Sequence, residues 1–135
     1  MSQRTLVLLK PDTVRRGLVG EILGRFEAKG LRIVALEQRT ISASIADAHY
    51  AEHVGKDFYP PLRAFVTSGP LVALVLEGDE AIEVIRGLNG ATDGRKAAPG
   101  TIRGDFSLSN RENLVHGSDS SESAHREIGL WFPEF

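Results

Sequence analysis

Thr5-Leu6-Val7-Leu8-Leu9 is an almost uninterrupted apolar run close to the start of the sequence. Runs of this kind are typical of strands that are buried on both faces of a sheet. The run ends at Lys10-Pro11, because proline cannot continue the hydrogen-bond ladder of a strand. We therefore predict a central strand at 5–9, with Lys10 at its end, either at the edge of a cleft or in solvent.

Amphipathic helices and further strands alternate along the rest of the chain. Apolar residues recur with helical spacing from Leu18 to Phe26, and Gly30 is placed to end that helix. The glycine-rich, basic stretch 91–104 lacks apolar periodicity and is expected to be a long functional loop. The other predicted elements are strands at 31–41 and 71–76, a helix at 81–88 capped by Asp79, and a last helix from about Ser120.

The order of these elements contains the ferredoxin-like β-α-β-β-α-β pattern. Buried strands that alternate with amphipathic helices predict a sheet with helices packed on it. We therefore expect an α+β (α/β) fold, a ferredoxin-like sandwich with an antiparallel four-stranded sheet and added helices. A length of 135 residues suits a single domain spanning 1–135.

The composition excludes several classes of protein. Lys and Arg number 16 against 18 Asp and Glu, a formal net charge of -2, whereas dedicated nucleic-acid-binding domains are usually basic. The chain has no cysteine, which excludes disulfides and thiolate chemistry. It shows no signal-peptide h-region and no apolar run of the ~20 residues needed to span a bilayer. We therefore expect a cytoplasmic protein without membrane or dedicated nucleic-acid partners.

The stretch Asn113-Leu114-Val115-His116-Gly117-Ser118-Asp119-Ser120 brings a single histidine to the end of an apolar pair. The pair Leu114-Val115 is typical of the end of a buried strand, and Gly117 can turn the chain sharply by adopting a positive φ. A hydroxyl or carboxylate at 118–120 can cap the helix that follows. His116 is therefore expected to point into a cleft, as a nucleophile, a general base or a ligand. The alternative interpretation is a polar turn with an incidental histidine.

A competing motif, His49-Tyr50-Ala51-Glu52-His53, matches the H-x-x-E-H signature of inverzincin metalloproteases. Ser44 and Asp47 form a variant capping box, which predicts a helix from Ile45 through this segment. The two histidines would then lie at i and i+4 on one helix face, as a zinc pair does. A zinc site also needs a third ligand, and no placed candidate stands out. The alternative interpretation is a solvated helix face.

Three separated motifs resemble those of the nucleoside diphosphate kinases, namely Lys10-Pro11-Asp12, residues 99–105 (P-G-T-I-R-G-D) and residues 113–119 (N-x-x-H-G-S-D). They lie in the family's order, and the resemblance covers essentially the whole chain. It implies a transferase that moves the γ-phosphate of a nucleoside triphosphate to a nucleoside diphosphate, in a ping-pong cycle through a phosphohistidine at His116. The alternatives are a non-catalytic nucleotide-binding regulator on the same fold and a zinc hydrolase built on the H-x-x-E-H motif.

A kinase site in this chain must hold phosphates with charged side chains, because neither a G-x-x-x-x-G-K-[ST] loop nor a G-x-G-x-x-G motif is present. Arg86 and Arg103 can make bidentate contacts with phosphate oxygens, or else form surface ion pairs. Mg²⁺ would be held mainly by the nucleotide phosphates and water, since it dehydrates reluctantly. We assign it no protein ligand.

The resemblance also implies roles for individual side chains. Glu127 would accept a hydrogen bond from the ring nitrogen of His116 that does not attack, as a triad carboxylate does. Phe58 would stack on the base, although core filling is the commoner role of an aromatic residue. The other implied roles are sugar contacts from Lys10 and Asn113, a hydroxyl contact from Thr92, and support of the histidine region by Tyr50 and Ser118.

Three positions depart from the family's pattern. Thr13 stands where many members have glycine, Ala91 where many have an acidic residue, and Asn110 where many have an apolar residue beside the base. The predicted side chains read no base edge, and every base offers a π-face, so broad tolerance of base and sugar is expected. The family's assemblies imply a homo-oligomer, with a hexamer favoured over a tetramer.

Overall fold

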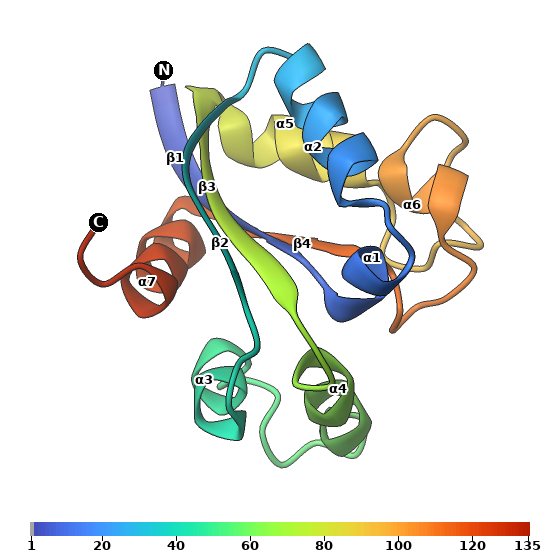
Figure 1. The fold of residues 1–135 in the computed structure, drawn as a ribbon, viewed down its shortest axis with the longest axis vertical. Coiled ribbons are helices and arrows are strands. Elements are labelled where there is room, and N and C mark those ends of the chain that lie inside the picture. The colour runs from blue at the N-terminus through green and yellow to red at the C-terminus, as the bar shows by residue number, and fades with distance from the viewer. Residues whose placement is uncertain (1) are drawn as a thin grey trace.

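A four-stranded antiparallel sheet forms the centre of the computed structural model, which describes residues 2–135 (Figure 1). The strands are β1 (Ser2–Leu9), β2 (Arg32–Arg39), β3 (Leu71–Asp79) and β4 (Val115–Gly117). Their order is β2-β3-β1-β4. β1 pairs with β3 along its whole length and with β4 near its carboxyl end. The central place predicted for the first apolar run is therefore confirmed, as is the ferredoxin-like arrangement.

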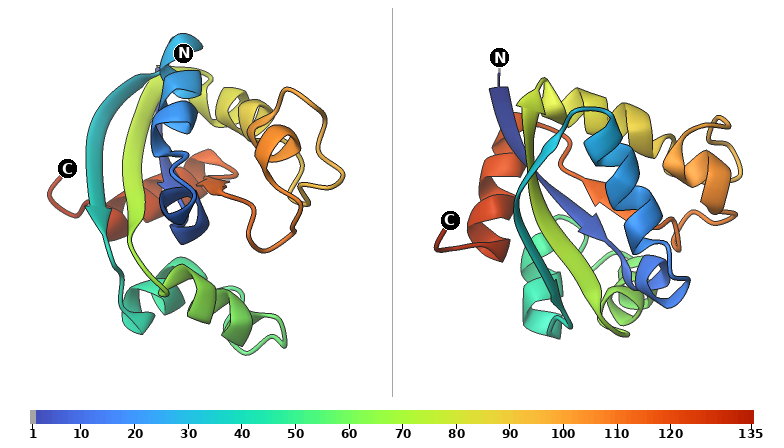
Figure 2. Two further views of the ribbon diagram at one scale, coloured as in Figure 1. Left: turned by 45° about the vertical axis from the view of Figure 1, so that its right-hand side comes forward. Right: turned by 45° about the horizontal axis from the view of Figure 1, so that its top comes forward.

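Helices cover both faces of the sheet (Figure 2). They are α1 (Pro11–Arg15), α2 (Val19–Ala28), α3 (Ala43–His49), α4 (Tyr59–Val66), α5 (Ala81–Asn89), α6 (Ile102–Phe106) and α7 (Ser121–Trp131). Val7 and Leu9 join a core with α2 and α5, while Leu6 and Leu8 join a second core with α3, α4 and α7. Alternate side chains of a strand face opposite sides, so the stretch Leu6 to Leu9 of β1 needs apolar residues on both faces. Among residues 2–135, no helix is long and apolar enough to cross a membrane.

The helix that carries the H-x-x-E-H motif begins earlier and ends sooner than predicted. Its N-cap is Ser42, whose hydroxyl accepts a hydrogen bond from the Ile45 backbone N–H, so the predicted capping box at Ser44 is wrong. The helix ends at His49. The second half of the motif therefore lies outside the helix.

The start of α5 also differs from the prediction. The residue at its N-cap is Glu80, which has a left-handed φ of 49° and makes no side-chain cap, while Asp79 is the last residue of β3. The Ile82 N–H donates instead to Oε1 of Gln3 on β1. A helix cap supplied by a strand 79 residues away cannot be found from local spacing.

The predicted loop at 91–104 is shorter in the structure, because α6 begins at Ile102. The Thr101 hydroxyl caps this helix and accepts a hydrogen bond of 3.0 Å from the Gly104 N–H. A Cβ at Gly104 would lie 1.9 Å from the carbonyl oxygen of Ala98. The tight loop-to-helix turn therefore requires glycine. This turn holds Arg103 against the start of β4, where its guanidinium donates to the Val115 carbonyl.

Candidate active site

A cavity of about 760 Å³ opens beside β4, a volume in the range of small-molecule sites. Nine of the ten side chains predicted for nucleotide chemistry line this cavity. The tenth, Ser118, is buried in the protein. The nine that line it are Lys10, Tyr50, Phe58, Arg86, Thr92, Arg103, Asn113, His116 and Glu127.

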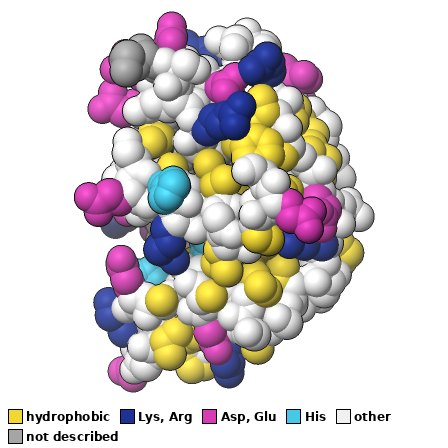
Figure 3. Space-filling view, turned by 90° about the vertical axis from the view of Figure 1, so that its left-hand side faces the viewer, with side chains coloured by type: hydrophobic (Ala, Val, Ile, Leu, Met, Phe, Trp, Pro, Cys, Tyr) yellow, Lys and Arg dark blue, Asp and Glu magenta, His cyan; other side chains and the backbone are white. Residues whose placement is uncertain are grey.

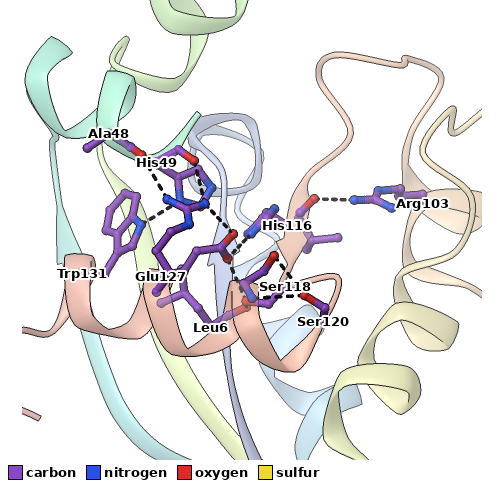
Figure 4. A network of polar contacts seen from close by, with 12 residues as sticks. Leu6, Ala48, His49, Arg103, His116, Ser118, Ser120, Glu127 and Trp131 are labelled. Atoms are coloured by element: carbon purple, nitrogen blue, oxygen red, sulfur yellow. Dashed lines mark hydrogen bonds and ion pairs between the residues drawn. The ribbon is translucent and has the colours of Figure 1, made fainter. Parts of the chain in front are cut away.

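His116 lies on β4 with its ring fixed from one side (Figure 4). Its Nε2 is 2.8 Å from Oε1 of the buried Glu127 on α7. The Ser118 hydroxyl donates to the same carboxylate oxygen at 2.8 Å. A carboxylate oxygen can only accept, so the hydrogen of a neutral His116 ring lies on Nε2. The lone pair that remains for chemistry is therefore on Nδ1.

Leu114, directly before β4, has a positive φ of 76°, which is rare for a residue with a branched side chain. The segment after β1 holds it there. The Lys10 N–H and the Thr13 hydroxyl donate to the Leu114 carbonyl at 2.8 Å and 2.7 Å. Asp12 accepts the Leu114 N–H at 3.1 Å. The K-P-D segment therefore positions the strand that carries His116, a role of Asp12 that its sequence motif did not predict, and Thr13 adds to it.

Gly117 serves a different purpose from the one predicted. Positive φ occurs at Leu114 rather than at Gly117, so the predicted glycine turn is wrong. A Cβ on Gly117 would lie 3.1 Å from Ile85 Cγ2 and 3.2 Å from Asn89 Nδ2. The glycine therefore allows α5 to pack closely against β4. The cap of α7 is Ser120, one of the three candidates, which accepts a hydrogen bond from the Ser123 N–H.

Lys10 and Asn113 form a buried pair at the cavity floor. The Lys10 ammonium donates to Oδ1 of Asn113 at 2.9 Å. Asn113 uses its own amide to donate to the carbonyls of Thr92 and Asn110. Lys10 therefore keeps two of its three donors for a ligand, while Asn113 mainly holds the loops together. Burial, followed by the charge of Arg103, lowers the pKa of Lys10 to about 8, against the opposing effect of Asp12.

This lowered pKa predicts that nucleotide binding takes up a proton in alkaline solution. Above about pH 8 the free protein loses the Lys10 charge, and an anionic ligand stabilises the protonated ammonium. Calorimetric titration with ADP at about pH 8.5, in buffers of different ionisation enthalpy, should report uptake of up to about one proton. Lys10→Arg keeps its charge and should remove this uptake. Equal heats in all buffers for the wild-type protein would contradict the prediction.

Arg103 and Arg86 bring two positive charges together beside His116. The Arg103 guanidinium donates to the carbonyls of Asn113, Gly90 and Val115, so about two of its five N–H groups remain for a ligand. Burial and the charge of Arg86 lower the pKa of Arg103 to about 10. A bound anion would relieve this repulsion between the cations. The pair is therefore suited to phosphate, with Arg86 exposed at the last turn of α5.

Two aromatic side chains complete the cavity. Phe58 is 49% exposed, with the His53 ring at 5.2 Å and the Lys56 ammonium at 5.9 Å. It can therefore offer a ring face to a base, and it is not a core residue. The hydroxyl of Tyr50 is buried and has no hydrogen-bond partner within residues 2–135. Burial and the nearby Glu127 raise the pKa of Tyr50, so this hydroxyl stays protonated and can act as a donor.

The zinc pair of His49 and His53, one of the alternative interpretations of this motif, does not form. Because α3 ends at His49, the two histidines do not share a helix face. His49 is buried, and its Nδ1 accepts a hydrogen bond of 3.0 Å from Trp131 Nε1. The donor atoms that do gather, within 4.8 Å of one another, belong to His49, His116 and Glu127. His49 is thus a close neighbour of His116, a contact that the sequence motif did not predict.

Comparisons with known proteins agree with this geometry. The profile of a family described as nucleoside diphosphate kinase matches residues 3–135. A protein of that name from a Nocardioides species is 81% identical over 133 residues, which is 98% of each chain. One from Cutibacterium acnes is 64% identical, over 97% of this chain and 95% of that protein.

Solved structures show the same similarity. A halophilic nucleoside diphosphate kinase from Halobacterium salinarum, in complex with CDP, is 47% identical with a TM-score of 0.96, covering 99% of this chain and 90% of that one. A nucleoside diphosphate kinase family protein from Babesia bovis has a TM-score of 0.94 at 46% identity, over 98% of this chain and 90% of that one. The chain belongs to the nucleoside diphosphate kinase family.

Proposed function

We propose that this phosphotransferase works through a covalent phosphohistidine on Nδ1 of His116. The observation that carries the proposal is the 2.8 Å contact of His116 Nε2 with Glu127, which leaves Nδ1 as the nucleophile. Attack forms an Nδ1–P bond as the bond from the γ-phosphorus to the β,γ-bridging oxygen breaks, and the nucleoside diphosphate leaves with that electron pair. A second diphosphate then reverses the step. Glu127 holds the Nε2 proton and stabilises the positive charge that develops on the ring.

The nucleotide is held by groups that all nucleotides share. Phe58 stacks on the base, and the free donors of Lys10, with Asn113 behind them, contact the sugar. Arg86, Arg103 and the Thr92 hydroxyl bind phosphate oxygens. The Tyr50 hydroxyl, which has no partner within residues 2–135, adds a donor at the wall of the cavity. The CDP complex of the Halobacterium salinarum relative supports a nucleoside diphosphate as ligand.

Enzymes of this family use a divalent cation, and we propose Mg²⁺ for this chain. Mg²⁺ prefers oxygen ligands and keeps much of its water shell. The donor cluster in the cavity contains two histidines and one carboxylate, which does not suit that preference. The cation would therefore be held by nucleotide phosphates and water, where it neutralises charge on the phosphates.

The decisive experiment is incubation with γ-labelled ATP and Mg²⁺, followed by denaturation. A base-stable, acid-labile label on the protein is expected for phosphohistidine. Absence of the label would favour a nucleotide-binding regulator, in which the histidine has no covalent role. Stoichiometric zinc in the purified protein would favour a hydrolase.

We predict that the enzyme turns over ATP, GTP, CTP and UTP with similar kcat/KM. Phe58 offers only a ring face, and every base has one. Deoxyribonucleotides keep the 3′-hydroxyl and lose one hydrogen bond, worth about 0.5–1.5 kcal/mol. The measurement is kcat/KM for the four triphosphates with one acceptor. A preference beyond about a thousandfold, as in hydrogen-bonded readout, would contradict the prediction and direct attention to Asn110.

We also propose a cytoplasmic homo-oligomer, a hexamer in preference to a tetramer. β2 is an outer strand of the sheet, and its Leu36 is 48% exposed. Outer strands offer unpaired backbone groups to another chain. The face at the left of Figure 1 exposes hydrophobic side chains between charged ones (Figure 3). Light scattering should give six times the mass of one chain, and a monomeric mass would contradict the proposal.

A further inference from the structure

His49 is a buried histidine whose ring packs against that of His116, the proposed nucleophile. It is the last residue of α3 and is 4% exposed. Three rings pack against its own in T-shaped arrangements: the Tyr50 ring at 4.6 Å, the His116 ring at 4.7 Å and the Trp131 ring at 5.6 Å. Its backbone carbonyl accepts a hydrogen bond from Arg126, which also lies 3.6 Å from Oε2 of Glu127. His49 is therefore built into the same block as the nucleophile and its carboxylate (Figure 4).

The contact with Trp131 decides which nitrogen of His49 carries the hydrogen. An indole N–H can only donate, and it donates to Nδ1 of His49 at 3.0 Å. Nδ1 must therefore present its lone pair, so the hydrogen of the neutral ring lies on Nε2. Burial, followed by the charge of His116, lowers the pKa of His49 to about 2, and the ring stays neutral. The titratable and charged groups near it are Lys10, Tyr50, His53, His116, Arg126 and Glu127.

This tautomer makes His49 unsuited to two other roles. A metal ion or a phosphoryl group needs a nitrogen lone pair. The lone pair on Nδ1 is occupied by Trp131, and Nε2 carries the hydrogen. The three donor atoms within 4.8 Å of one another therefore do not make a ready cation site, and His49 does not compete with His116 for the phosphoryl group.

We propose that His49 is a positioning residue, locked by Trp131 as the neutral Nε2–H tautomer. The His49 ring packs against the His116 ring, and it keeps Nε2 of His116 on Glu127 and Nδ1 of His116 towards the nucleotide. This inference rests on the proposed function, in which His116 is the nucleophile. If the His116 ring rocked by a fraction of an ångström, its Nδ1 would lose alignment with the γ-phosphorus. Misplacement by about 1 Å can lower a rate about 10²-fold.

The tautomer is tested first, in the intact wild-type enzyme without nucleotide. Long-range ¹H–¹⁵N spectra of the imidazole nitrogens report which nitrogen carries the hydrogen, and the His49 signals are assigned by their loss in His49→Gln. We expect a neutral ring protonated at Nε2 from about pH 5 to about pH 9. A hydrogen on Nδ1, or titration of His49 within that range, would overturn the proposal.

The positioning role is tested by the single-turnover rate of phosphohistidine formation. His49→Phe keeps a flat ring but loses the acceptor for Trp131, and should slow the step about 10–100-fold with little change in nucleotide affinity. His49→Gln offers an amide oxygen to Trp131 and an N–H to the cavity, and should recover most of the rate. His125→Gln, an exposed histidine on α7, is the matched control.

The outcomes separate this inference from the proposed function. A wild-type rate in His49→Phe, or an equal loss in both His49 variants, would overturn the positioning role while phosphohistidine still forms. Failure of the wild-type enzyme to form phosphohistidine would instead overturn the proposed function, and the spectra would still decide the tautomer.

Discussion

Replacement of His116 by alanine is expected to abolish phosphoryl transfer, with a loss of at least about 10⁴-fold in kcat, since removal of a covalent nucleophile has effects of this size. His116 is the group whose free nitrogen faces the cavity beside Arg86 and Arg103. Without it the γ-phosphate has no acceptor on the protein. Direct transfer between two nucleotides would require both to occupy one cavity at the same time.

The variant should still fold and bind nucleotide. Glu127 keeps the hydrogen bond from Ser118, so its buried carboxylate retains a donor, and the proposed binding groups Phe58, Arg86 and Arg103 are untouched. We would measure the phosphohistidine label, turnover and ADP affinity, with His125→Ala as the control on the exposed side of α7. Turnover within tenfold of the wild type would exclude the covalent route through this residue.

Replacement of Glu127 by glutamine is expected to slow phosphorylation about 10²–10³-fold without preventing it, the range found when one electrostatic contact in an active site is removed. Oε1 of Glu127 accepts hydrogen bonds from both His116 and Ser118. An amide oxygen could still accept both, but it stabilises the positive charge on the ring less. If the amide N–H₂ faces His116, it favours the tautomer with hydrogen on Nδ1, which cannot attack.

This prediction is checked by rapid-quench measurement of the phosphohistidine in a single turnover. Nucleotide affinity should stay close to that of the wild type, because the Glu127 carboxylate is bound to side chains of the protein. Glu122→Gln changes the same group on the exposed first turn of α7 and serves as the control. An unchanged phosphorylation rate in Glu127→Gln would remove the carboxylate from the mechanism.

The central strands and the nucleophile could be predicted from the sequence because their signals are local. β1 from Leu6 to Leu9 and β3 from Leu71 to Leu76 are continuously apolar, since helices cover both faces of the sheet, and this pattern identifies buried strands. The amphipathic spacing of α2 and the placement of Gly30 gave its extent to within a few residues. The site could be predicted from three motifs in the family's order. Each motif contributes a side chain to the cavity, namely Lys10, Arg103 and His116.

Tertiary structure alone decided the contacts that join segments far apart in the chain. Leu114 takes its positive φ because Lys10, Asp12 and Thr13 bind its backbone. Sequence spacing instead suggested Gly117 for that turn, because glycine is the residue that adopts positive φ at little cost. Long-range hydrogen bonds can stabilise a rare conformation in another residue, and they leave no periodic signal in the sequence.

The role of the H-x-x-E-H segment shows the same division. Its spacing satisfied a zinc motif only if the helix continued, and α3 ends at its first histidine. Trp131, 82 residues further along the chain, then takes Nδ1 of that histidine and turns a potential ligand into a neutral neighbour of His116. The sequence by itself determined which residues could do the chemistry, and the folded chain determined which ring nitrogens were free to do it.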